Sequence, residues 1–163
     1  MKKSNMLFLL MLSLLQSCNK NTNEISSIDD IVLDSTTYEN NSNDDNDNME
    51  IILKIDNKII DVKWEDNESV VALKELAKQG ITINMSKYST FEQVGSIGKV
   101  LPSNDIQMTT NPGDIVLYSS NQLVIFYGSN SWRYTYLGHI DLDKDSLKEL
   151  LGNQDVKITL SIK

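Results

Sequence analysis

The sequence predicts one mainly β domain over residues 49–163, folded as a closed antiparallel β-barrel of about eight strands with two helices. Short runs of alternating apolar and polar residues show the period of two that half-buried strands have. Turn residues separate these runs, and two other stretches change to the period of a helix. A closed barrel suits so many short strands because closure removes exposed sheet edges.

The domain is expected to begin with a hairpin followed by a helix. Apolar residues alternate along residues 49–55 and again along residues 60–64, on either side of a turn at Asp56-Asn57. From Asn67 to Gln79 the apolar positions instead fall on one helical stripe. Asn67 is a good residue to cap the start of this helix, and a glycine follows its end.

The rest of the domain reads as strands around one further helix. Asn111-Pro112-Gly113-Asp114 has proline and then glycine at its centre, as a type II turn requires. The helix is expected at residues 143–151 and ends before Gly152. Strands are expected at residues 81–85, 115–118, 122–127, 133–140 and 156–162.

Four motifs, in this order, resemble the bacterial cyclophilin-like domain family. They are FEQVGSIG at 91–98, LPSND at 101–105, PGDIVLY at 112–118 and YGSNSWRYTYLG at 127–138. The resemblance extends over essentially all of residues 50–163. It implies a small β-barrel of the shape that the peptidyl-prolyl isomerases have.

The first residues have the pattern of a lipoprotein signal peptide, which we expect at residues 1–17. Lys2 and Lys3 precede an apolar run of about ten residues, too short to span a bilayer as a helix. A small residue before the single cysteine, Cys18, resembles a lipobox, so we expect Cys18 to be acylated and to hold the exported chain on membrane lipid. The alternative is an ordinary signal peptide with an incidental cysteine.

Residues 18–48 are expected to form an acidic, Asn/Asp-rich disordered tether. Eight of the nine residues from 40 to 48 are Asn or Asp, and such a run cannot offset its ordering entropy by burial. The net charge is −7 over residues 18–48 and −3 over residues 49–163. This balance argues against a nucleic-acid partner, because no basic patch is present to replace counterions.

Familiar catalytic and metal-binding patterns are absent from the sequence, and no cofactor is expected. The run of aspartates from Asp141 to Asp145 opens like a calcium loop, but Ser146 and Gly152 replace the turn glycine and the bidentate glutamate. Helix capping explains these aspartates better. His139, the single histidine, cannot build a histidine-based metal cluster and reads as a partly exposed strand residue.

The resemblance also allows a test for prolyl isomerase activity. Active cyclophilins present an arginine that donates to the twisted prolyl amide, five residues before a phenylalanine, with a glutamine three residues further on. The corresponding region here has Lys87, Phe91 and Gln93, with a different spacing and no arginine. A lysine is a mobile point charge and replaces a planar guanidinium poorly. We therefore expect little or no isomerase activity and assign no catalytic residue.

What remains is a possible binding face for an extended peptide or a small ligand. Its candidate residues are Phe91, Glu92, Gln93, Tyr127, Trp132, Arg133 and Tyr134. Alternation places Trp132 and Tyr134 on one side of their strand and Arg133 on the other. The alternative, which we favour for Trp132 and Tyr136, is that these rings belong to the barrel core.

Three functions follow from the sequence. The first is a membrane-anchored, non-catalytic module that binds a peptide or small molecule. The second is a divergent peptidyl-prolyl cis-trans isomerase that assists protein folding in the cell envelope. The third is a structural lipoprotein whose barrel docks on a partner. The missing arginine favours the first and third over the second.

Overall fold

The computed structural model describes residues 49–163. The expected signal peptide at 1–17, the tether at 18–48 and the lipid site at Cys18 lie outside the described residues. Within residues 49–163 there are ten strands and two helices. They are β1 Ile51–Ile55, β2 Lys58–Ile60, β3 Val62–Trp64, α1 Glu68–Ala77, β4 Ile81–Tyr88, β5 Glu92–Ser96, β6 Ile106–Thr109, β7 Asp114–Tyr118, β8 Gln122–Phe126, β9 Ser131–Ile140, α2 Lys144–Leu151 and β10 Val156–Ile162.

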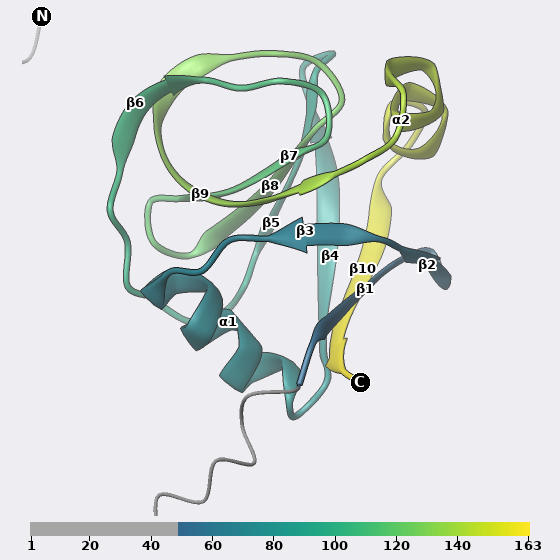
Figure 1. The fold of residues 1–163 in the computed structure, drawn as a ribbon. Coiled ribbons are helices and arrows are strands. Elements are labelled where there is room, and N and C mark those ends of the chain that lie inside the picture. The colour runs from purple at the N-terminus through teal and green to yellow at the C-terminus, as the bar shows by residue number, and fades with distance from the viewer. Residues whose placement is uncertain (1–48) are drawn as a thin grey trace, which may run out of the picture. The chain divides into compact units, whose positions relative to one another are not determined.

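The strands form one antiparallel sheet that curls into a nearly closed barrel, which confirms the mainly β fold. Nine of them follow the order β2-β1-β10-β4-β5-β8-β7-β9-β3, and β6 pairs with β9. The two ends of this order, β2 and β3, are consecutive in the chain and flank Asp61. The Trp64 indole of β3 donates to Ile51 O of β1 at 3.1 Å across the remaining gap. Figure 1 shows α1 and α2 at opposite ends of this barrel.

The expected hairpin of residues 49–64 is wrong in its second half. β1 pairs with β2 through the Asp56-Asn57 turn, whose two residues both have positive φ. After Asp61 the chain leaves β1, and Val62–Trp64 pairs with β9 instead. Gly138 permits this crossing, because a Cβ there would lie 2.6 Å from Lys63 O. The near-closure of the barrel therefore depends on a contact between residues far apart in the sequence.

Both helices form where their capping residues predict them. The Asn67 side chain accepts a hydrogen bond from Val70 N at the start of α1. Asp143 caps α2 by accepting from the backbone of Asp145 and Ser146. The hydrogen bond from the Ser146 hydroxyl, followed by the one from its backbone, lowers the pKa of the exposed Asp143.

The core has two parts, one on each side of the curled sheet. The larger part fills the barrel with Ile and Leu side chains from the strands and both helices. A smaller cluster lies on the outer face of β7 and β8 and consists of Val116, Val124, Phe126 and Tyr134. Met108 of β6 packs against this cluster, so β6 and the start of β9 cover part of the outer face. This second layer holds the site described next.

Candidate functional site

A pocket of about 340 Å³ opens beside the smaller cluster on the outer face of the sheet. We call it the aromatic pocket. Side chains from β4, β5, β7, β8 and β9 line it, together with one residue from the loop before β9. The lining residues are Tyr88, Glu92, Val94, Tyr118, Val124, Asn130, Trp132 and Tyr134.

The strand register explains why these residues meet. Glu92 of β5 lies opposite Phe126 of β8, and Val94 lies opposite Val124. Side chains alternate across a strand, so Glu92 and Val94 project to the same side as the smaller cluster. β7 extends this face, since its Val116 also lies opposite Val124. Alternation and the strand register together thus place an acid among apolar neighbours here.

Glu92 is the most unusual residue of the pocket. The residue is 6% exposed, and its Oε2 is buried without a hydrogen-bond partner among the described residues. Burial raises the pKa of the Glu92 carboxyl from 4.5 to about 7, because a buried carboxylate loses its hydration. Near neutral pH the pocket wall therefore carries an acid that is close to half ionised.

Tyr134 forms the floor of the pocket and is held from three directions. Its ring packs edge-on against Tyr118 at a centroid distance of 5.9 Å and against Phe126 at 5.6 Å. Its hydroxyl accepts a hydrogen bond from Asn130 Nδ2 at 2.9 Å. Burial, followed by the nearby Glu92, raises the pKa of the Tyr134 hydroxyl. The ring is therefore fixed and neutral at physiological pH.

Three other aromatic side chains of the pocket face solvent. Trp132 is 57% exposed, Tyr88 is 63% exposed and Tyr118 is 39% exposed. Large aromatic side chains cost free energy when they remain in water and are common where a ligand packs against them. Together with Tyr134 they give the pocket aromatic walls around one carboxyl group.

The aromatic pocket brings together three of the seven predicted ligand-binding residues, namely Glu92, Trp132 and Tyr134. Gln93 lies on the other side of β5, inside the barrel, and is fully buried. Its Nε2 donates to Leu151 O at 2.6 Å and to Gln154 O at 2.7 Å, while its Oε1 has no partner among the described residues. Gln93 thus fastens the end of α2 and does not line the pocket.

The remaining predicted residues also lie outside the pocket lining. Phe91 packs against the edge of the smaller cluster, and its carbonyl accepts from Tyr127 N and Gly128 N. The Tyr127 ring belongs to the main core, with its hydroxyl buried and without a partner in the described part of the chain. Arg133 is exposed, on the opposite side of β9 from Trp132, and its Nη2 donates to Asp105 O at 2.6 Å.

The preference for Trp132 as a core residue is wrong. Trp132 and Arg133 do lie on opposite sides of β9, as alternation predicts. However, β6 covers only part of the outer face here, so the Trp132 side chain remains exposed. Tyr136 is partly buried against the smaller cluster, not in the barrel interior. The sequence reasoning also missed Tyr88, Tyr118 and Asn130. Tyr118 could have been found, because alternation along β7 places it on the same side as Val116.

His139 and Asp114 form a second polar contact outside the pocket. The imidazole Nδ1 lies 2.9 Å from Asp114 Oδ1, and the Tyr136 hydroxyl donates to the same oxygen at 3.3 Å. Asp114 Oδ2 accepts from Asn111 N, so this carboxylate stabilises the turn at Pro112-Gly113. His139 is partly exposed, as expected. Within residues 49–163, no three His, Cys, Asp or Glu side chains gather closely enough to hold a metal ion.

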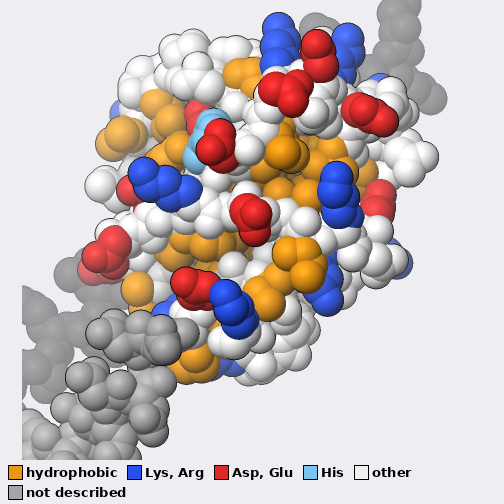
Figure 2. Space-filling model, turned by 45° about the vertical axis from the view of Figure 1, so that its right-hand side comes forward, with side chains coloured by type: hydrophobic (Ala, Val, Ile, Leu, Met, Phe, Trp, Pro, Cys, Tyr) orange, Lys and Arg blue, Asp and Glu red, His pale blue; other side chains and the backbone are white. Residues whose placement is uncertain are grey.

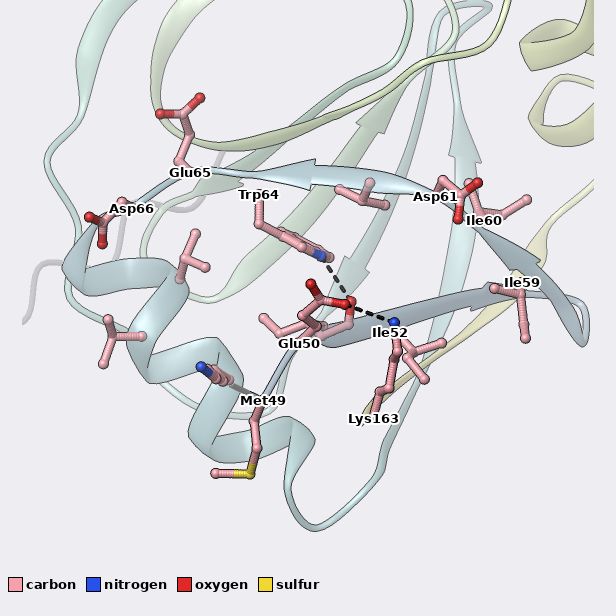
Figure 3. A pocket seen from close by; sticks show the side chains of 15 residues that line it. Met49, Glu50, Ile52, Ile59, Ile60, Asp61, Trp64, Glu65, Asp66 and Lys163 are labelled. Atoms are coloured by element: carbon pink, nitrogen blue, oxygen red, sulfur yellow. Dashed lines mark hydrogen bonds and ion pairs between the residues drawn. The ribbon is translucent and has the colours of Figure 1, made fainter. Parts of the chain in front are cut away.

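A larger hollow of about 670 Å³ lies where the barrel does not quite close, between α1, β1 and β3. Figure 3 shows Trp64 on one wall of this hollow and Glu50 on another. Two polar contacts already cross it: Trp64 donates to Ile51 O, and the Lys163 ammonium pairs with Glu50 at 3.0 Å. We therefore regard the aromatic pocket, with its unpartnered carboxyl, as the candidate functional site.

The surface of the domain mixes charges of both signs. On the face shown in Figure 2, Lys and Arg side chains are scattered among Asp and Glu, with hydrophobic side chains between them. Among residues 49–163, no helix has the length and apolar character that a membrane span needs.

Comparison with known proteins gives one match. The model of a family described as the cyclophilin-like family matches residues 53–163. No curated protein and no solved structure matches the chain. The matched range begins within β1 and ends at the last residue, so it includes every element that builds the aromatic pocket.

Proposed function

This chain belongs to the cyclophilin-like family, and we propose that it is a membrane-anchored, non-catalytic module that binds an extended peptide or a small molecule. The observation that carries this proposal is the aromatic pocket itself. Exposed Trp132 and Tyr88 stand beside a fixed Tyr134 and a carboxyl group, in a cavity of about 340 Å³. Apolar and aromatic walls with a few polar groups are typical of ligand sites.

The positions of the basic residues support binding rather than prolyl isomerisation. Isomerisation would need a cationic donor at the pocket to hydrogen-bond the twisted amide. The Lys87 ammonium instead donates to Gly152 O at 3.2 Å, and Arg133 reaches Asp105 O on the other side of β9. Neither side chain lines the aromatic pocket.

The membrane anchor is the part of the proposal that rests on sequence. The short apolar run after Lys2 and Lys3 and the small residue before Cys18 favour an exported, acylated chain. Two or more acyl chains would anchor it firmly, since each buried methylene contributes about 0.8 kcal/mol. The acidic run at 40–48 would then separate the domain from the lipid headgroups.

Binding can be tested with a permanently unfolded, carboxymethylated polypeptide as the probe. We expect it to shift the NMR signals of Trp132, Tyr118 and Asn130. Trp132→Ala should weaken binding at least tenfold, whereas Val100→Ala removes a 77% exposed side chain that does not line the pocket and should leave binding unchanged. Prolyl isomerase turnover that disappears in Lys87→Ala or Arg133→Ala would instead establish the enzyme.

A further inference from the structure

We propose that the aromatic pocket recognises an organic cation, specifically an alkylammonium group, with Glu92 as its counter-charge. This inference rests on the proposed binding function and names the chemistry of the ligand. It begins from one observation: the pocket-lining residue Glu92 is 94% buried, yet its Oε2 has no hydrogen-bond donor among the described residues. Buried carboxyl groups in folded proteins are ordinarily paired or hydrogen-bonded, because burial removes their water.

The groups around Glu92 leave its charge uncompensated. The ionisable residues that share the pocket wall are tyrosines: Tyr88 from β4, Tyr118 from β7 and Tyr134 from β9. The Tyr134 hydroxyl accepts from Asn130 Nδ2, and it makes no hydrogen bond to Glu92 Oε2. Burial raises the pKa of Glu92 to about 7, and burial followed by the proximity of this acid raises the pKa of Tyr127 and Tyr134.

The neighbouring basic side chains are committed elsewhere. Lys87 lies one residue before Tyr88, but its side chain reaches the carbonyl of Gly152. Arg133 lies between Trp132 and Tyr134, but its guanidinium reaches the carbonyl of Asp105. No Lys or Arg is among the residues of the described chain that line the pocket. A cation that neutralises Glu92 must therefore arrive with the ligand.

The walls of the pocket match the same ligand chemistry. Cations are attracted to the faces of Trp and Tyr rings, and Trp132, Tyr88 and Tyr118 present exposed aromatic surface around the carboxyl. A primary ammonium has three hydrogens to donate and can pair with the Glu92 carboxylate where it lines the pocket. Asn130 Oδ1 accepts from Ser131 N, and its second lone pair can accept from another hydrogen of the ammonium. The alkyl stem would pack against Val94 and Val124.

The proposal predicts a defined dependence on pH. An ammonium favours the ionised form of Glu92, so below the pKa of this acid a proton must leave when the ligand binds. Affinity should rise about tenfold per pH unit up to the pKa and then level off. A ligand that instead accepts a hydrogen bond from protonated Glu92 would show the opposite trend.

The experiment is calorimetric titration of the purified full chain with Nα-acetyl-lysine N-methylamide and with its neutral Nε-acetylated counterpart. At pH 8 we expect the charged compound to bind at least tenfold more tightly. Glu92→Gln, which preserves shape, should abolish that difference and the pH dependence. Exposed Glu65→Gln serves as the matched control and should change neither. Titration with n-butylammonium chloride shows whether a free amine suffices or a peptide backbone is required as well.

The outcomes separate this inference from the proposed function. If both lysine compounds bind equally and Glu92→Gln binds like the parent, the cation inference is wrong while the binding module stands. Affinity that falls with rising pH also overturns the inference. If neither compound nor the unfolded polypeptide shifts the NMR signal of Trp132, both proposals fail. A thermal unfolding curve for Glu92→Gln confirms that the variant is folded in each case.

Discussion

The buried acid of the aromatic pocket should make the stability of the domain depend on pH, and Glu92→Gln is the change that tests it. The pKa of Glu92 rises from 4.5 to about 7 on folding, so the folded state holds this proton more tightly than the unfolded chain does. The resulting stability is fully present below pH 4.5 and is lost as the pH rises toward 7. At about 1.4 kcal/mol per pKa unit, the loss is about 3 kcal/mol.

Glutamine keeps the shape of the side chain but cannot ionise, so the variant should not show this loss. Its buried amide lacks partners too, which costs about 1 kcal/mol at every pH. We therefore expect Glu92→Gln to be slightly less stable than the parent at pH 5 and about 2 kcal/mol more stable at pH 8.5. The measurement is urea-induced unfolding at both pH values, with the exposed Glu65→Gln as the control. A difference between variant and parent that does not change with pH would refute the reasoning.

Three further predictions concern other parts of the chain. Gln93→Ala should destabilise the domain by about 2 kcal/mol, because the carbonyls of Leu151 and Gln154 lose their hydrogen-bond donor. Hydrogen exchange should then show that α2 opens first, and unchanged protection of α2 would contradict this. Gly138→Ala should lower the free energy of unfolding by about 2 kcal/mol or more, since the added methyl would lie 2.6 Å from Lys63 O. The loss of NMR contacts between β3 and β9 would show that this strand pair has separated. Cys18→Ala should release the exported chain from membranes or block signal removal; quantitative membrane partitioning of this variant would end the lipoprotein proposal.

Local signals in the sequence predicted much of the fold. Asn67 and Asp143 cap the two helices by contacts within their own first turns, and such contacts can be read from neighbouring residues. The last strand alternates strictly and forms as expected. By contrast, the course of Val62–Trp64 depends on pairing with β9, about 75 residues away. Gly95 lies within β5, where its missing side chain makes room for Ile83 and Met85, and this close packing of two strands depends on the fold as a whole.

The candidate site shows the same division between local and distant information. Alternation along β9 separated Trp132 from Arg133 correctly, and it should equally have separated Glu92 from Gln93. Tyr88 lies opposite Glu92 in the hairpin of β4 and β5, so its signal was local; it was missed because the strand was expected to end at residue 85. The absence of a donor for Glu92 depends on all the surrounding elements at once, so the sequence alone could not show it.

The meeting of the two ends of the domain sets its response to mechanical force. Ile51 lies opposite Ile162, and Lys163 N donates to Glu50 O at the same end of the β1–β10 pair. A pull applied between the two ends therefore acts across the hydrogen-bonded ladder rather than along it. The paired residues separate one after another, from Ile51–Ile162 toward Ile55–Ile158. Each step therefore meets only the resistance of the hydrogen bonds at one residue pair. Stretched in this way, the domain unzips at low force, and its first and last strands separate before the pocket is disturbed.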